Sequence, residues 1–207
     1  MDDALAVPGR VALLVYDMQT GILHQIADGD RVLAEVGGVL DAARTAGVRT
    51  IFTRHVTLPT ELMGVSQLRM WRSWQRVSTA AEVSSPFPHD APHAQLAPEL
   101  APAPPEAILD KITMSAFEGT WLDIVLRDCG VTTVVVVGVA LEIGVEPTVR
   151  HAADLGYLPI LIPDACAAGD QAAGQRSLES LQFLGDALFT DLNGFRSGLG
   201  LSAGMHG

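Results

Sequence analysis

Two polar residues stand where buried strands are expected to end. Asp17 follows the apolar block 11–16, and Lys111 follows the expected strand 106–110. A carboxylate at the end of a buried strand is costly unless it has a partner or a purpose. An aspartate beside a buried lysine can serve in proton transfer, because each group shifts the pKa of the other. The pair can equally be a plain ion pair that closes the sheet, and the spacing alone leaves both alternatives open.

A third stretch that could take part in catalysis, residues 138–150, crosses from a strand into a helix. Residues 132–137 are β-branched and apolar, which is typical of a strand covered on both faces. Apolar residues recur at helical spacing from Val145 onward, and Pro147 fits a first helical turn. Gly144 therefore stands where helix N-termini offer free N–H groups to ligands, and we expect such groups to converge on a pocket there. A nucleophile could occupy this position, yet glycine has no side chain.

Strand-like and helix-like segments alternate along the chain. The expected strands are residues 11–16, 48–53, 106–110, 132–137, 157–162 and 187–190. Helical faces are expected over 30–47, 61–77, 120–129, 145–156 and around 178–184. Residues 86–105 contain seven prolines and are expected to form an extended surface excursion. This order predicts right-handed parallel crossovers and a three-layer α/β domain.

Composition narrows the class of protein. The 207 residues fit one domain, 1–207, with its core in 10–195. The net charge of −11 and the scattered basic residues argue against a nucleic-acid or anionic-membrane partner. No apolar run reaches the ~18 residues of a membrane span, and the start lacks a signal-peptide core. Cys129 and Cys166 form no disulfide framework or metal motif, so we expect a cytoplasmic protein with two buried, ordinary thiols.

Three ordered motifs resemble the isochorismatase-like cysteine hydrolases, a superfamily with nicotinamidases, N-carbamoylsarcosine amidases and true isochorismatases. The motifs are Asp17-Met-Gln, residues 111–120, and residues 138–156, and the resemblance extends from about Val11 to Asp191. It implies a Rossmann-like α/β/α sandwich with a six-stranded parallel sheet. It also implies an Asp–Lys–Cys triad, as in the amidase branch, in which Asp17 and Lys111 match and the cysteine falls on Gly144.

Loss of that cysteine removes the thiolate on which covalent acyl transfer depends. Isochorismatases proper also carry glycine here, and they hydrolyse a vinyl ether without a covalent intermediate. In that chemistry a carboxylic acid protonates the enol-ether carbon and water adds to the cation. We therefore predict Asp17 as the acid/base, Lys111 as its electrostatic partner, and Gly144 as an open position for water.

The candidate substrate-binding residues are Gln19, Arg54, His55, Trp71, Phe117, Val139 and Ala140. By resemblance, Gln19 helps to hold Asp17, and a cis peptide is expected between Val139 and Ala140. Arg54 and His55 are placed near a substrate carboxylate, although a packing role is the commoner one for a histidine like His55.

Trp71 and Phe117 each fit the core or another role. For Trp71 the alternative is a pocket lid or a subunit contact, and for Phe117 it is the lining of the pocket. Zinc-binding members use an Asp-x-His pair with a second histidine soon after. Here Thr53-Arg-His has neither the Asp nor another histidine before His89, so we expect no metal and no cofactor.

The resulting hypothesis is a hydrolase acting on a small carboxylated metabolite, with vinyl-ether hydrolysis favoured over C–N cleavage. We expect a homo-oligomer, a dimer or a tetramer. Two alternatives stay open. One is a catalytically silent homologue that binds a small molecule or supports an oligomer, and the other is an amidase whose cysteine was replaced at Gly144.

Overall fold

A six-stranded sheet with all strands parallel forms the centre of the computed structural model, which describes residues 2–201. The strands are β1 (Val11–Tyr16), β2 (Arg49–His55), β3 (Ala107–Lys111), β4 (Thr133–Val139), β5 (Leu158–Ala167) and β6 (Leu188–Phe189). Their order in the sheet is β3-β2-β1-β4-β5-β6. The predicted α/β/α sandwich and its parallel sheet are confirmed, with strand boundaries shifted by a few residues.

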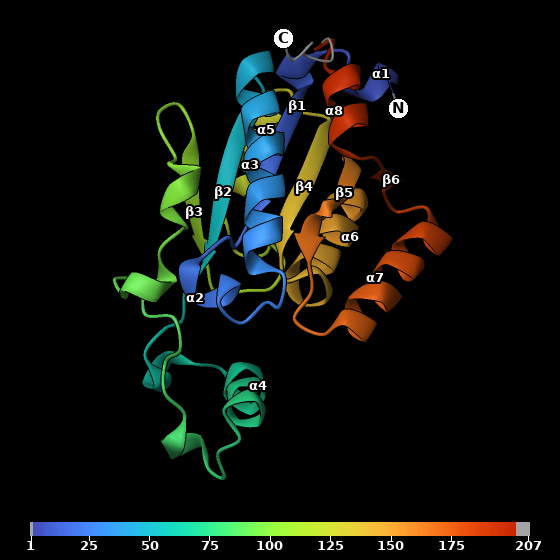
Figure 1. Cartoon of the computed structure of the whole chain (residues 1–207). Coiled ribbons are helices and arrows are strands. Elements are labelled where there is room, and N and C mark those ends of the chain that lie inside the picture. The colour runs from blue at the N-terminus through green and yellow to red at the C-terminus, as the bar shows by residue number, and fades with distance from the viewer. Residues whose placement is uncertain (1, 202–207) are drawn as a thin grey trace.

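Helices cover both faces of the sheet (Figure 1). One face carries α3 (Gly29–Ala46), with α1 (Asp2–Leu5) and α8 (Leu192–Gly198). The other carries α5 (Leu122–Asp128), α6 (Glu146–Asp154) and α7 (Gln171–Leu184). No helix within residues 2–201 is both long enough and apolar enough to cross a membrane.

Strand β1 is buried along its whole length, and its side chains alternate between the two faces. Leu13 and Val15 pack in the cluster under α3, whereas Leu14 and Tyr16 pack in the cluster under α5 and α6. Strand order reverses between β1 and β4, because β2 and β3 continue in one direction and β5 and β6 in the other. In sheets of this kind, ligands bind in the crevice beyond the carboxyl ends of the strands at that reversal.

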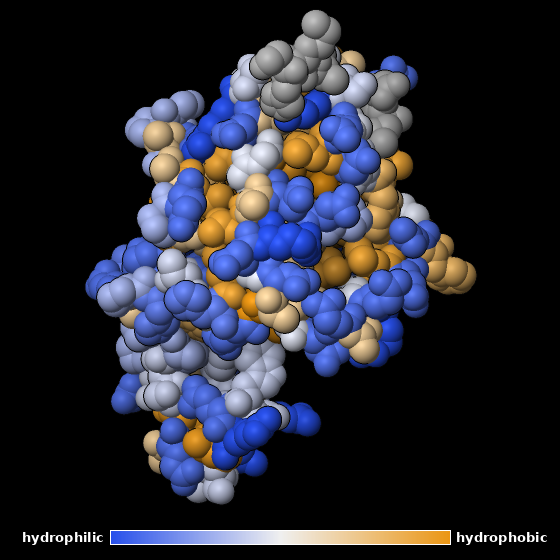
Figure 2. Space-filling view, in the orientation of Figure 1, coloured by the Kyte–Doolittle hydropathy of each residue, from blue (hydrophilic) through white to orange (hydrophobic). Residues whose placement is uncertain are grey.

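Residues 57–106 form an irregular excursion from the sheet, and its part with α4 protrudes below the sheet (Figure 1). It contains α4 (Val65–Gln75) and four short 3₁₀ turns, at Thr60–Leu62, Ala80–Glu82, Pro92–Ala94 and Pro98–Leu100. The helix is shorter than the predicted 61–77, since Gly64 precedes its first turn and Arg76 ends it in a left-handed conformation. Its own small apolar cluster contains Trp71 and Phe87. Figure 2 shows apolar side chains emerging between hydrophilic ones at the tip of this protrusion.

The proline-rich part of the protrusion is less superficial than expected. Ala94 and Leu100 are buried, and Leu96 forms a bridge with Gln19 immediately after β1. The short helix α2 (Thr20–Leu23) packs against the 3₁₀ turn at Pro92–Ala94. The segment is therefore tied to the carboxyl edge of the sheet, where it forms part of the pocket wall described below.

Candidate active site

Asp17 is the first residue after β1 and adopts a left-handed backbone conformation with φ of 46°. That conformation is unfavourable for a residue with a side chain and persists only where its surroundings impose it. Thr53 on β2 provides one constraint, because the Asp17 N–H donates to the Thr53 hydroxyl (3.0 Å), which itself donates to Asp17 Oδ1 (2.6 Å). The carboxylate is 4% exposed and faces the pocket.

Lys111 ends β3 and reaches Asp17 across the end of β2. Its Nζ lies 2.7 Å from Asp17 Oδ2 and 3.2 Å from the Thr113 carbonyl oxygen, and its side chain is fully buried. Burial lowers the pKa of Lys111, while the Asp17 carboxylate opposes that shift. Both Asp17 oxygens thus accept hydrogen bonds, one from Lys111 and one from Thr53. A carboxylate held in this way is arranged to take a proton rather than to donate one.

Tyr16, the last residue of β1, was not a predicted site residue, yet it lines the pocket beside Asp17. Its ring lies under Lys111, with the ammonium nitrogen 4.3 Å from the ring centroid. Its hydroxyl donates to the Met114 carbonyl oxygen. Burial and the neighbouring Asp17 charge raise the pKa of Tyr16 well above its usual value, so the phenol stays neutral. The sequence signal that could have identified Tyr16 is the alternation of side chains along β1. This alternation directs residue 16 toward the helix that follows Gly144.

Gly144 lies in a π-helical turn, Leu141–Val145, that precedes α6, and not in the first turn of that helix. The N–H groups of Ile143, Gly144 and Val145 all donate to the Ala140 carbonyl oxygen, at 3.2, 3.0 and 3.3 Å. The expectation that they converge on the pocket is therefore wrong. The position is also not open, because a β-carbon at residue 144 would lie 2.0 Å from the Tyr16 hydroxyl oxygen. The phenol, rather than water, fills the space beside the glycine.

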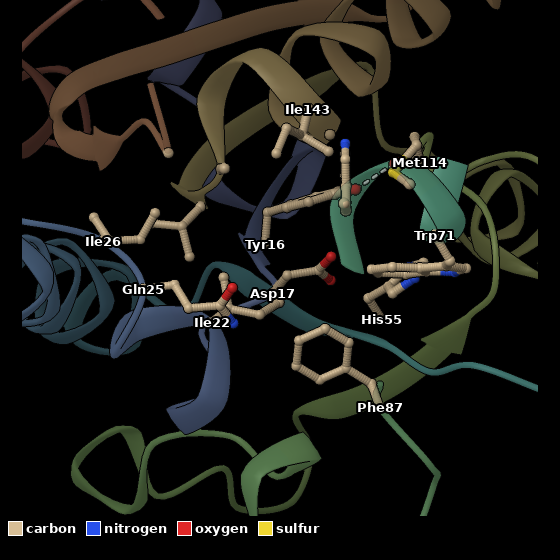
Figure 3. A pocket seen from close by; sticks show the side chains of 15 residues that line it. Tyr16, Asp17, Ile22, Gln25, Ile26, His55, Trp71, Phe87, Met114 and Ile143 are labelled. Atoms are coloured by element: carbon tan, nitrogen blue, oxygen red, sulfur yellow. Dashed lines mark hydrogen bonds between the residues drawn. The ribbon is translucent and has the colours of Figure 1, made fainter. Parts of the chain in front are cut away.

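A cavity of about 320 Å³ opens between these residues and the protrusion. Figure 3 shows Trp71, His55 and Phe87 gathered on one side of the Asp17 carboxylate. Ile22, Gln25 and Ile26 lie on the opposite side of the carboxylate in the same view. Trp71 thus combines the two predicted roles, since it is buried in the small cluster and also faces the pocket. Phe87 comes from the proline-rich segment, and nothing in its sequence context marked it as a site residue.

Two polar side chains in this aromatic group have no hydrogen-bond partner among the described residues. They are His55, at both ring nitrogens, and Trp71, at Nε1. Both side chains are 5% exposed, and their ring centroids are 6.1 Å apart. Burial, reinforced by the nearby Lys111 charge, lowers the pKa of His55 to about 4, while Asp17 and the Thr113 backbone act in the opposite direction. At neutral pH the imidazole is uncharged. Buried polar atoms without partners are uncommon and require an explanation.

Comparisons with known proteins identify the family and the fold. The sequence profile of the isochorismatase domain matches residues 11–191. The chain belongs to the isochorismatase family. It is 28% identical over 191 residues to a ureidoacrylate amidohydrolase, RutB, of Pseudomonas syringae, covering 84% of this chain and 78% of that protein. It is 30% identical to the uncharacterized family protein YecD of Escherichia coli O157:H7, covering 82% and 86%.

Solved structures show the same fold. A cysteine hydrolase from Pseudomonas syringae pv. phaseolicola superposes with a TM-score of 0.79 at 26% identity, over 94% of both chains. The N-carbamoylsarcosine amidase of Thermoplasma acidophilum superposes with a TM-score of 0.72 at 22% identity, over 89% of this chain and 97% of that one. The latter likeness concerns the fold alone. The family resemblance seen in the sequence is confirmed, and the chain is a hydrolase of this family by descent.

Within this isochorismatase-family site, several predicted residues lie at the pocket and others do not. Asp17, Gly144, His55, Trp71, Val139 and Ala140 line it, and the expected cis peptide joins Val139 to Ala140. Lys111 is not among the lining residues, but its ammonium group binds the Asp17 carboxylate. The Gln19 backbone N–H donates to the Asp17 carbonyl oxygen (2.7 Å). The Gln19 side chain instead hydrogen-bonds the His55 backbone and the Ala94 carbonyl oxygen, so it fixes the position of His55.

Two predicted pocket residues lie elsewhere. Arg54 points away from the pocket, because successive side chains of β2 point to opposite faces and His55 takes the pocket face. The Arg54 guanidinium binds the Asp110 carboxylate at 2.6 and 2.7 Å. It is therefore not available for a substrate carboxylate. Phe117 lies in the core under α5 and α6, where it stacks on Tyr157 with centroids 5.8 Å apart. Both placements correct the sequence-based expectation.

Metal binding finds no support in the arrangement of the side chains. Between residues 2 and 201, no group of three or more His, Cys, Asp or Glu side chains is arranged to hold a metal ion. His55, the match to the zinc-binding histidine, is surrounded by Trp71 and Phe87 instead of by further ligands. The donor set does not fit a zinc ion.

Proposed function

We propose that this isochorismatase-family protein hydrolyses a small uncharged amide or urea by direct attack of water, without a covalent intermediate. The observation that carries this proposal is the Asp17–Lys111 pair, which is intact at the pocket wall while the position of the family thiol has no side chain. A buried ion pair is costly to desolvate and weak support for stability. Its presence beside a cavity therefore favours a chemical role.

The reaction assigned to this geometry uses Asp17 as a general base. Asp17 removes a proton from a water molecule as the water oxygen bonds to the substrate carbonyl carbon. The tetrahedral intermediate then collapses, the C–N bond breaks, and Asp17 returns the proton to the leaving nitrogen. Lys111 stays charged and stabilises the Asp17 carboxylate before and after the step. Trp71 lines the same cavity, and its Nε1–H has no hydrogen-bond partner among the described residues.

The charges at the pocket support an uncharged substrate. Among the residues that line it there is no lysine or arginine, and Asp17 contributes a negative charge. Lys111 is fully buried and already engaged. His55 is neutral at physiological pH. A substrate carboxylate would meet no counter-ion here, so we replace the expectation of a carboxylated metabolite with that of a neutral, hydrogen-bonding one.

The choice between C–N and vinyl-ether cleavage rests on how Asp17 is held. Vinyl-ether hydrolysis requires a protonated carboxyl group that donates to carbon, whereas both Asp17 oxygens accept hydrogen bonds. The Pseudomonas syringae relative named above is a ureidoacrylate amidohydrolase, which supports cleavage of a C–N bond. Its named substrate carries a carboxylate, so the proposal of an uncharged substrate rests on the pocket charges alone. These points favour an amide or a urea as the substrate. A vinyl ether is the substrate class predicted from the glycine at position 144.

A product assay tests the proposal. The protein is incubated with small neutral amides and ureas, with their carboxylated analogues and with isochorismate, and ammonia and pyruvate are measured. We expect ammonia from a neutral substrate, none from the Asp17→Asn variant, and no mass adduct on protein quenched during turnover. Pyruvate from isochorismate would restore the vinyl-ether hypothesis, and a stable adduct would contradict direct water attack.

A second candidate function is supported by Tyr16. Because the phenol fills the space beside Gly144, the chain could retain the pocket only for binding. Calorimetric titration with the same neutral compounds separates the two functions. Saturable binding of a compound that yields no product under any condition would favour the binding protein.

A further inference from the structure

We propose that Tyr16 and Gly144 form an interdependent pair that determines which chemistry this site can perform. The Tyr16 ring takes the volume that a side chain at position 144 needs, and it supplies the contact to the Lys111 ammonium. An aromatic ring at position 16 and a thiol at position 144 therefore exclude each other. This inference concerns the protein alone and does not depend on which substrate is hydrolysed.

The distances at Gly144 leave no room for a β-carbon. Such an atom would lie 2.0 Å from the Tyr16 hydroxyl oxygen and 2.5 Å from both Cε1 and Cζ of the same ring. Ordinary contacts between non-bonded carbon atoms are about 3.5–4.0 Å. All three nearest atoms belong to one side chain, so Tyr16 is the first obstruction that a β-carbon at position 144 would meet.

The Tyr16 ring is held from several directions and cannot simply turn aside. It is 1% exposed and lies within the apolar cluster under α5 and α6. Its hydroxyl donates to the Met114 carbonyl oxygen, and Lys111 Nζ is 4.3 Å from its centroid. Figure 3 shows the ring edge directed toward Met114, away from Ile26. A cation over an aromatic face is attracted by the ring quadrupole, more strongly when both are desolvated. Tyr16 is accordingly a positioning residue for Lys111.

A second glycine provides a matched control. A β-carbon at Gly138 would also meet Tyr16, but at its backbone, 2.1 Å from the carbonyl oxygen. Gly138 has φ of 121°, a conformation that side chains rarely adopt. Shortening the Tyr16 side chain therefore relieves the contact at Gly144 and leaves the contact at Gly138 unchanged.

A double-mutant cycle on stability tests the pair. We expect Gly144→Ala to lower the urea midpoint in the parent protein and to cost much less in a Tyr16→Val background. The non-additivity should correspond to roughly ten-fold or more in the unfolding equilibrium constant. Tyr16→Phe should give little rescue, because Cε1 and Cζ remain in place. Gly138→Ala should be equally costly in the parent and in the Tyr16→Val background. Equal costs for Gly144→Ala in both backgrounds would overturn the inference.

Thiol reactivity tests the chemical consequence. Cys129 and Cys166 are first replaced by serine, and Gly144→Cys is then made with Tyr16 intact and with Tyr16→Val. We expect the double variant to fold and its thiol to react rapidly with iodoacetamide near neutral pH, since Lys111 lies beside it. The single variant should be misfolded or at least ten-fold slower to label. A single variant that folds and labels as fast as the double one would overturn the proposal. So would a double variant that fails to fold when Tyr16→Val alone folds. Neither readout uses turnover, so the outcome is independent of the hydrolase proposal.

Discussion

The two sides of the pocket are built on different principles. On one side, Asp17, Thr53 and Lys111 come from the ends of three adjacent strands, and each polar atom has a partner at hydrogen-bond distance. On the other side, Tyr16 and Gly144 fit each other by volume, with one ring filling the space of a missing side chain. The polar side tolerates little change because every atom is paired. The steric side can change its chemistry when two residues change together.

The largest expected effect tests the polar side. Asp17→Asn keeps the shape of the side chain but removes the base, so turnover of an identified substrate should fall by ~10²–10⁴-fold. Circular dichroism should show that the fold is retained, whereas the urea midpoint should fall, because Lys111 is left buried without its counter-ion. Asp128→Asn, at an exposed position on α5, is the control and should leave turnover unchanged. Full activity of the Asp17 variant would show that Asp17 and Lys111 form only a structural ion pair. The polar side of the pocket would then have no chemical role.

The second effect concerns stability. Lys111→Met leaves the Asp17 carboxylate buried without its counter-ion, and breaking a buried pair in this way costs about 3–5 kcal/mol. Arg31→Met is the control, because Arg31 lies at the surface, where it contacts Asp28 at 3.9 Å and donates to the Asp164 carbonyl oxygen. Its cost should be about 1 kcal/mol or less. Urea unfolding of both variants measures the difference, and similar costs would mean that the buried pair contributes no more than a surface one.

A third prediction follows from His55, whose pKa is lowered from 6.5 to about 4. The unfolded chain binds a proton on this residue at higher pH than the folded chain does. Stability therefore falls as the pH falls from about 6.5 through about 4, by roughly 3 kcal/mol in total. The His55→Phe variant, which keeps an aromatic ring, should lose this part of the pH dependence. A pH profile of the unfolding free energy that is identical in both proteins would contradict the neutral imidazole.

The smallest effect concerns the native thiols. Burial raises the pKa of Cys166 to about 12, and Cys129 is half-buried and not fully buried as expected. We expect iodoacetamide to label Cys166 slowly in folded protein and rapidly in urea, as followed by mass spectrometry. Rapid labelling of Cys166 near neutral pH would reveal a nucleophile within β5 and weaken the assignment of chemistry to Asp17.

The fold and the polar half of the site were accessible from the sequence because they depend on local patterns. Apolar blocks of β-branched residues identify strands, and polar residues directly after them are carried to one edge of a parallel sheet. The positions of Asp17 and Lys111 follow from that rule, whereas the cis peptide at Val139–Ala140 was expected from the family resemblance. Arg54 was misplaced because alternation directs neighbouring side chains of β2 to opposite sides, which gives His55 to the pocket and Arg54 to Asp110.

The sequence by itself therefore determined the α/β/α architecture, the family and the charged pair. Only the tertiary structure decided what stands beside Gly144 and which aromatic residues form the pocket. Tyr16 and Gly144 belong to β1 and to the turn after β4, and they meet because these strands are neighbours at the point where strand order reverses. Phe87 reaches the pocket from the irregular stretch after α4, which has no periodic pattern to place it. Packing between distant segments depends on volumes and distances, and a linear pattern of residue types does not encode these directly.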